Sequence, residues 1–212
     1  MKHSSSCFVY YIKHFEAIVD DKLLWNEHID GITIRASKGL GMLRRMKPFV
    51  PRSILITIYK PLILLYLDYC CLVWDNCSNY LLDNLQKIQN RAARIITGES
   101  YEIRSSDLLR KLNWPILKER RPHQKAMFMF KVKNEQVAQS VAELFSVTNN
   151  ENHELRSNNK NYFNDKPKTN FLKKSIGYSG ASYWNNLPRS YKTEGINLQQ
   201  FRALLRDGAT KQ

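Results

Sequence analysis

The segment 79–97 constrains the fold more than any other part of the chain, because its apolar side chains recur with the period of an α-helix. The stripe consists of Leu81, Leu82, Leu85, Ile88, Ala92 and Ile95. Gly98 follows directly, and glycine is the residue that most often ends a helix in the left-handed conformation. The pattern predicts an amphipathic helix with one buried face, ending at Thr97.

A second long helix is predicted over about 26–46, with Asn26 as its N-cap. Its apolar positions also share one face and are Ile29, Ile32, Ala36, Leu40 and Leu43. Gly39 and Gly41 weaken this helix slightly and favour close packing against a neighbour.

A third helix is predicted from Pro51 through Leu62, because proline suits the first turn of a helix. Pro61 removes one backbone donor and predicts a kink. The stretch 54–67 is very apolar, but Lys60 and Pro61 interrupt it, and a membrane span needs about 20 apolar residues. We therefore expect a buried helix and no transmembrane segment.

Shorter helices are predicted downstream. Ser105 or Ser106 is the expected cap of a helix over 108–112. Pro115 opens another, and Pro122 should confine or break the first turns of that helix. The apolar residues of that helix are Met127, Phe128, Phe130 and Val132. A last helical stretch covers 137–145, and a strand is predicted near 15–19.

Composition changes at Thr148, after which the chain is rich in Asn and Lys and poor in aliphatic residues, as in a polar linker. A compact module follows, in which 171–178 is expected to be extended. Ser179 is the predicted cap of a short helix that contains Trp184. Asn197 is the predicted cap of a last helix, whose apolar residues are Phe201, Leu204 and Leu205.

A formal net charge of +14 is the largest signal in the composition. A surface this basic attracts polyanions, with nucleic acid the first candidate and an anionic membrane the second. A basic protein without any nucleic-acid role is the alternative. No apolar signal-peptide core follows Met1, so we expect an intracellular protein, cytoplasmic or nuclear.

Neither cysteine nor histidine spacing indicates a metal site. The cysteines are Cys7, Cys70, Cys71 and Cys77, without paired CxxC spacing, and are expected to pack as reduced, small apolar residues. The histidines are scattered at His3, His14, His28, His123 and His153. No phosphate-binding glycine loop or nucleophile elbow occurs, so we expect no cofactor, no metal and no small-molecule substrate.

Three stretches of sequence carry a resemblance to one family. The first is LWNEHI at 24–29 with KGLGMLRR at 38–45. The second is YLDY at 66–69 and VW at 73–74, followed by LQKIQNRAARIITG at 85–98. The third is YSGASYWNNLP at 178–188. In this order they resemble the C-terminal region of reverse transcriptases from jockey- and CR1-like non-LTR retrotransposons.

The resemblance implies a helical thumb, the part of the polymerase that holds the primer–template duplex, and a post-thumb extension. Together with the helical patterns it predicts a mostly α-helical protein. The predicted parts are a degenerate N-terminal segment at 1–21, a thumb-like helical region at 22–146, a polar linker at 147–170 and a small α or α+β module at 171–212.

The polymerase chemistry of the family is expected to be absent. Such an enzyme holds two metal ions between carboxylates from separate strands. The pair Asp20–Asp21 looks similar, but it precedes LWNEHI by only a few residues, and the 19 residues before it are too few for a palm. We interpret the pair as part of a solvated turn and predict a fragment without catalytic activity.

Basic residues are the candidate nucleic-acid-binding residues, since Lys and Arg contact phosphates and give salt-dependent affinity. They form three groups: Arg44, Arg45 and Lys47; Lys87, Arg91 and Arg94; and Arg120, Arg121 and Lys125. The alternative for each residue is a merely solvated position. The aromatic residues Tyr69, Trp74, Trp114 and Trp184 lie in apolar patterns, which favours core packing over base stacking.

The leading hypothesis is therefore a non-catalytic piece of a retroelement polymerase that binds an RNA/DNA duplex through its phosphate backbone. A polymerase core in another chain is a second candidate partner. The rival hypothesis is an inert or domesticated helical module that binds protein and has no nucleic-acid role.

Overall fold

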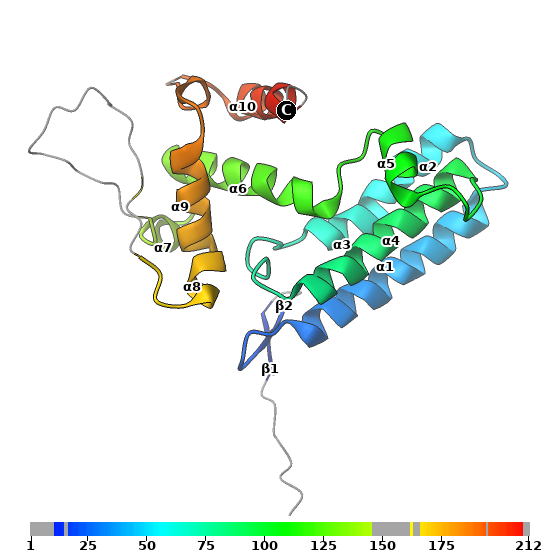
Figure 1. Cartoon of the computed structure of the whole chain (residues 1–212), viewed down its shortest axis with the longest axis horizontal. Helices are drawn as coiled ribbons and strands as arrows, with labels where there is room; N and C mark the ends of the chain where they lie inside the picture. The colour runs from blue at the N-terminus through cyan, green and yellow to red at the C-terminus, as the bar shows by residue number, and fades with distance from the viewer. Residues whose placement is uncertain (1–10, 15–16, 146–161, 163–165, 194, 210–212) are drawn as a thin grey trace, which may run out of the picture. The chain divides into compact units, whose positions relative to one another are not determined.

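A computed structural model of the chain describes residues 11–14, 17–145, 162, 166–193 and 195–209. The described chain is mostly helical, as the sequence predicts (Figure 1). It divides into two compact units, unit 1 at 1–117 and unit 2 at 118–212. The boundary between the two units, after Leu117, falls inside the predicted helical region 22–146. The domain boundaries expected from composition stay a prediction.

Unit 1 begins with a two-stranded antiparallel hairpin of β1 (Tyr11–His14) and β2 (Ala17–Asp20). The predicted strand near 15–19 overlaps β2, and its first residues lie outside the described ones. The helices of unit 1 follow: α1 (Asn26–Met46), α2 (Arg52–Tyr59), the π-helix η1 (Lys60–Leu64), α3 (Leu65–Asp68), α4 (Asn79–Thr97) and α5 (Ser105–Lys111).

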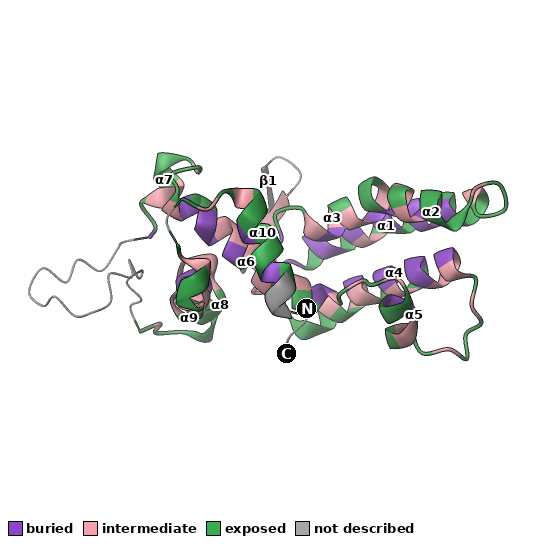
Figure 2. Ribbon diagram, turned by 90° about the horizontal axis from the view of Figure 1, so that it is seen from above, coloured by how far each residue is buried: buried purple, intermediate pink, exposed green. Residues whose placement is uncertain are grey.

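Helices α1 and α4 lie side by side and run in the same direction (Figure 1). At their N-terminal ends, Trp25 Nε1 donates to Asn76 Oδ1 over 2.6 Å. The predicted stripes of both helices enter one core, and their buried faces are the purple strips in Figure 2. Leu82 and Ile95, at the edges of the α4 stripe, are only half-buried, whereas Ile96 is buried. Gly98 ends α4 at φ 77°, as predicted.

The predicted kink at Pro61 takes the form of the π-helix η1. Proline has no N–H to donate to the preceding turn. The backbone changes to wider turns there, and the Leu65 N–H reaches Lys60 O, five residues back. The chain therefore passes through Pro61 without leaving the helical path, and Ile63 and Leu67 stay in the core.

Gly39 allows the closest approach between α1 and the returning chain. A Cβ atom at this position would lie 2.6 Å from Leu62 O and 2.8 Å from Ile63 Cγ1. A Cβ atom at Gly41 would meet nothing within 4 Å. The prediction of close packing is therefore confirmed for Gly39 and wrong for Gly41, which faces open space.

The turn before α1 depends on the Asp20 carboxylate. It accepts hydrogen bonds from the backbone N–H groups of Trp25 (2.7 Å), Leu24 (2.9 Å) and Lys22 (3.1 Å). Trp25 occupies the cap position of α1 at φ 67°, a conformation uncommon for residues other than glycine. The predicted N-cap, Asn26, is instead the first helical residue, and no side chain caps α1 by a hydrogen bond, because Asp20 holds the turn before the helix and not its first N–H groups.

Unit 2 contains α6 (Leu117–Lys133) from its second residue on, α7 (Gln139–Ala142), α8 (Asn170–Lys174), α9 (Ile176–Asn186), the 3₁₀-helix η2 (Arg189–Tyr191) and α10 (Leu198–Ala209). Phe130 stacks on Phe201 with ring centroids 4.4 Å apart, and Trp184 is buried beside them. Tyr162, within the predicted linker, is buried in this core and exchanges two backbone hydrogen bonds with the Asn185 amide, at 3.0 and 2.8 Å.

Several local predictions for unit 2 are corrected by the structure. Pro122 lies inside α6 and does not break it, since one lost donor costs less than the helix gains by burying Met129 and Phe130. The segment 171–178 is helical, not extended, and Ser179 lies within α9. Asn197 is the predicted cap: its Oδ1 accepts from Gln200 N–H, and Gln200 Oε1 accepts from Asn197 N–H, both at 2.9 Å.

Two smaller corrections concern other residues. Ser105 and Ser106 lie inside α5, after Arg104, and neither caps it by a side-chain bond. Leu144, in the predicted helical stretch 137–145, is exposed, whereas its neighbour Phe145 is buried. Among the described cysteines, Cys71 and Cys77 are buried, as expected, and Cys70 is exposed.

Gly39→Ala should destabilise unit 1 by about 1–3 kcal/mol, because the added methyl group overlaps Leu62 O and overpacks the contact. Gly41→Ala is the matched control and should stabilise by up to about 1 kcal/mol, since it adds helix propensity in open space. Urea unfolding followed by circular dichroism measures both changes. Equal effects of the two substitutions would contradict the close approach at Gly39.

Asp20→Ala should cost about 2 kcal/mol, because three backbone donors lose a charged acceptor. The same unfolding measurement applies, with the exposed neighbour in Asp21→Ala as the control. A loss of stability that is as large for Asp21→Ala would show that Asp20 does not hold this turn.

Candidate nucleic-acid interface

The first predicted basic group is fully presented on the surface. Arg44, Arg45 and Lys47 are exposed at the C-terminal end of α1 and in the turn that follows. Arg44 and Arg45 lie in the last helical turn, where cations interact favourably with the negative end of the helix dipole. Within the described residues, none of the three forms an ion pair.

The second group divides into two kinds of residue. Lys87 and Arg91 are exposed and lie one helical turn apart on α4, and Lys87 Nζ donates to Asn84 Oδ1 over 3.2 Å. Arg94, although it shares this face, folds back onto the chain. Its guanidinium donates to Ser100 O and, over 3.0 Å, to Ile103 O. Arg94 thus shapes the loop between α4 and α5.

The third group, on α6 of unit 2, is the least accessible. Arg121 is only 5% exposed, and Arg120 and Lys125 are half-buried. Each of the three also has an interaction within the chain. A buried guanidinium cannot reach a phosphate without leaving its site, so this group does not form an open cationic surface.

The turn between α1 and α2 lies next to the C-terminal end of α4, and residues of both segments extend the first basic group. Lys47 Nζ lies 3.3 Å from the position that a Cβ on Gly98 would take, so the α1–α2 turn lies against the end of α4. We call this end of unit 1 the bundle tip and define it as Arg44, Arg45, Lys47, Phe49, Arg52 and Tyr101. Arg52, Phe49 and Tyr101 were not among the predicted site residues.

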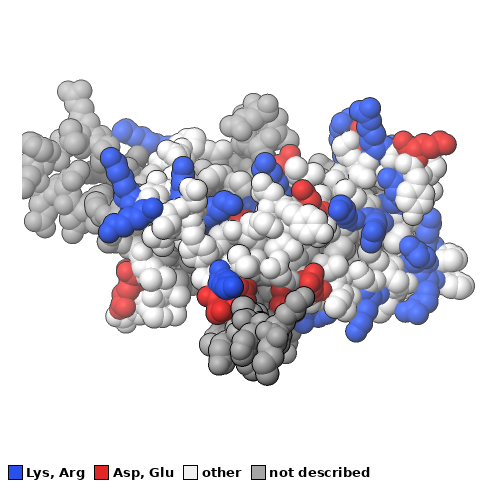
Figure 3. Space-filling model, turned by 60° about the horizontal axis from the view of Figure 1, so that its bottom comes forward, with Lys and Arg blue, Asp and Glu red and all other residues white. Residues whose placement is uncertain are grey.

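The bundle tip is strongly positive because the chain that forms most of it contains no acid. No Asp or Glu occurs between Asp30 and Asp68, a signal that the sequence contained. Glu99 lies close enough to Arg52 to be affected by its charge, but its main partner is Lys111, whose hydrogen bond over 2.8 Å and charge lower the Glu99 pKa. Figure 3 shows Lys and Arg side chains over the face it displays, with several gathered at the end where the α1–α2 turn lies.

The predicted aromatic residues mostly pack in the cores, as expected. Trp74 is fully buried, and its Nε1 donates to Tyr69 O over 3.0 Å. Trp114 stacks on Tyr59 with centroids 4.0 Å apart. Trp184 is buried in unit 2, whereas Tyr69 is partly exposed. The most exposed aromatic side chains among the described residues are instead Phe49 and Tyr101.

Asp20 and His28 both form hydrogen bonds to the backbone around the start of α1. Burial opposes ionisation of Asp20, but the backbone N–H groups of Leu24, Trp25 and Lys22 outweigh it and lower the pKa. His28 is buried between Trp25 and Trp74, and its Nδ1 accepts from the Ile18 N–H over 3.3 Å. Burial, with the Arg35 charge, lowers the His28 pKa. Among the described residues, no three His, Cys, Asp or Glu side chains gather as metal ligands.

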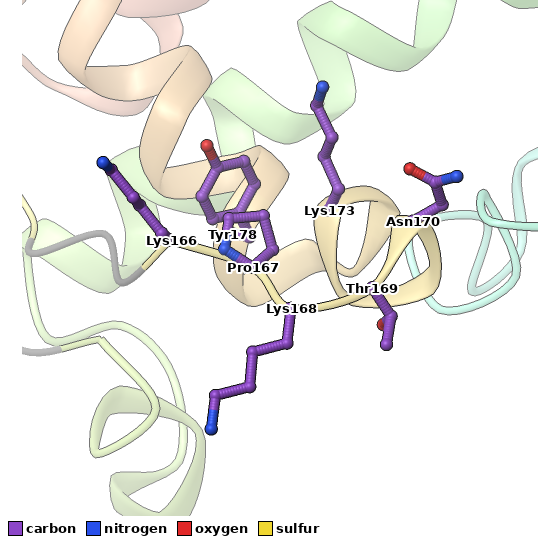
Figure 4. A pocket seen from close by; sticks show the side chains of 7 residues that line it. All are labelled: Lys166, Pro167, Lys168, Thr169, Asn170, Lys173 and Tyr178. Atoms are coloured by element: carbon purple, nitrogen blue, oxygen red, sulfur yellow. The ribbon is translucent and has the colours of Figure 1, made fainter.

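A shallow hollow in unit 2 is lined by Lys166, Pro167, Lys168, Thr169, Asn170, Lys173 and Tyr178. Figure 4 shows its three lysine side chains pointing in different directions. Their ammonium groups do not converge on one point, so the hollow lacks the geometry of an anion site. None of the described helices is long and apolar enough to cross a membrane.

The described chain is mostly helical, and the full sequence is strongly basic. Among the described residues, no group of side chains forms a metal centre. Over 103 residues the chain is 27% identical to the probable RNA-directed DNA polymerase from transposon X-element of Drosophila melanogaster. The match covers 47% of this chain and 11% of that protein. No protein-family model and no solved structure matches the chain. The chain is thus similar to part of a transposon reverse transcriptase.

Arg94→Ala should destabilise unit 1 by about 1–2 kcal/mol, because it removes the hydrogen bonds to Ser100 O and Ile103 O. Arg91→Ala is the control, an exposed arginine on the same helix, and should leave stability unchanged. Hydrogen exchange of the amides at 98–105 gives the local readout and should speed up only for Arg94→Ala. Unchanged exchange in that variant would show that Arg94 does not hold the loop.

Proposed function

We propose that the chain is a non-catalytic part of a transposon RNA-directed DNA polymerase and that unit 1 binds an RNA/DNA duplex through its phosphate backbone. The similarity to the transposon polymerase supports the first half of the proposal. The exposed cations of the bundle tip, together with Lys87 and Arg91 on α4, support the second.

The observation that carries the proposal is that these cations are not neutralised by neighbouring acids. Arg44, Arg45, Lys47, Lys87 and Arg91 have no ion pair within the described residues. When such a surface cation binds a polyanion, condensed counterions are released from the polyanion. Phosphate contacts of this kind position a duplex without reading its sequence. In a complete polymerase, such a surface would help to hold primer and template.

A second candidate function is docking onto a polymerase core in another chain. Apolar side chains exposed in unit 1 favour it: Leu24, Ile34, Leu65 and Val73. These apolar residues differ from the cations considered above, so the two candidate functions do not depend on the same side chains. A role in protein binding alone is the alternative, and it predicts no affinity for nucleic acid.

The purified chain should bind a labelled, blunt RNA–DNA hybrid with an affinity that falls along a straight line in a plot of log K against log salt concentration. Lys87→Ala with Arg91→Ala should make that line shallower, by about 0.9 for each phosphate that the variant no longer neutralises. Fluorescence anisotropy across a salt series measures the slope.

The control is Lys22→Ala with Lys60→Ala, which removes the same charge from two other exposed positions of unit 1. It should leave the slope close to that of the unmodified chain. Absence of binding at low salt by the folded chain would overturn the proposal. An equal change of slope in both double variants would show that net charge alone, and not this surface, attracts the hybrid.

A further inference from the structure

The bundle tip presents aromatic rings to solvent in a way that backbone binding does not require. Tyr101 is 87% exposed and Phe49 is 84% exposed, more than any other large apolar side chain among the described residues. Solvating such rings is unfavourable, and both lie beside cations. Duplex phosphates need only the cations, so the two rings need a separate explanation.

The local structure holds the Tyr101 ring and the backbone that carries Phe49. The Arg94 guanidinium lies over the Tyr101 ring, 4.9 Å from its centroid, and Arg94 is itself hydrogen-bonded to the loop at Ile103 O. Phe49 lies between Pro48 and Pro51, and its N–H donates to Met46 O over 2.9 Å. A pre-ordered ring or backbone segment loses less conformational entropy when a ligand stacks on it.

The cations around the two rings indicate which class of ligand fits the bundle tip. An apolar protein partner would cover the rings but would bury Arg44, Arg45 and Lys47 without providing opposite charge. A nucleic-acid strand offers a flat base for each ring and a phosphate for each cation, which is the chemistry of single-strand binding sites. Paired bases are stacked inside the duplex, so only unpaired nucleotides present a face to these rings.

We propose that the bundle tip binds unpaired nucleotides, with Phe49 and Tyr101 stacking on bases while Arg44, Arg45 and Lys47 contact the adjoining phosphates. This inference rests on the proposed function, because it assigns a strand to the same basic surface. The tip then recognises the point where a duplex continues into a single strand, and the exposed cations of α4 contact the paired region.

The test compares three labelled RNA–DNA hybrids at one salt concentration: blunt, with a single-stranded overhang, and with an overhang of abasic nucleotides. The abasic strand keeps the phosphates and lacks the bases. The full chain should bind the overhang about tenfold more tightly than the blunt hybrid, as expected for one or two stacked bases. The abasic overhang should recover little of this gain.

Phe49→Ala with Tyr101→Ala should abolish the gain and leave binding to the blunt hybrid unchanged. Tyr101→Phe, which keeps the ring, should retain it. Tyr80→Ala is the matched control, since Tyr80 is an exposed aromatic residue at the opposite end of α4. The substituted side chains are largely exposed, so folding should be preserved, and circular dichroism checks this for each variant.

The outcomes separate the two proposals. Salt-dependent binding to the blunt hybrid with no gain from the overhang would overturn the stacking site and leave backbone binding intact. A gain that survives the loss of both rings, or that the abasic overhang reproduces fully, would also overturn it. Failure to bind any of the three hybrids would overturn the proposed function and the stacking site with it.

Discussion

The packing of α1 against α4 is the contact on which the rest of unit 1 depends. Each helix buries one apolar face, and neither face is covered without the other helix and the returning segment α2–η1–α3. Gly39 sets how closely that segment approaches, because Leu62 O occupies the space that a side chain would need. The parallel arrangement brings both C-terminal ends together, and this proximity creates the bundle tip. The proposed interface is thus a consequence of core packing.

The basic residues are of two kinds: some are bonded or buried within the chain, and others are exposed to solvent. Arg94 orders the loop after α4 and lies over Tyr101, so it prepares the bundle tip without being presented as an open cation. Arg121 is buried in unit 2. Arg44, Arg45, Lys47, Lys87 and Arg91 stay exposed and form no ion pair among the described residues. A large net charge therefore indicates an affinity for polyanions in general. Where a polyanion can bind depends on which cations are exposed and which are hydrogen-bonded or buried within the chain.

Similarity to a transposon polymerase gives this surface its context, but the match covers a small part of that protein. The acidic pair at Asp20–Asp21 is interpreted from the sequence as part of a solvated turn, but Asp20 is only 8% exposed. Asp20 is used to cap the turn before α1, where its carboxylate binds three backbone N–H groups. The expectation that the chain lacks catalytic activity stays a prediction, as does its location in the cell.

The sequence by itself determined the amphipathic helices, because a period of 3.6 residues is a local property that the apolar positions of α1 and α4 record directly. It also determined the end of α4 at Gly98 and the capping box of α10, which depend on neighbours a few residues apart. Only the tertiary structure decided that Asp20 holds the turn before α1, that Pro122 stays helical and that Arg94 turns inward. These outcomes depend on contacts formed after the helices pack, and single-residue preferences are too weak to specify such contacts. The pairing of Phe49 with Tyr101 at one tip has the same origin, since 52 positions separate them along the chain.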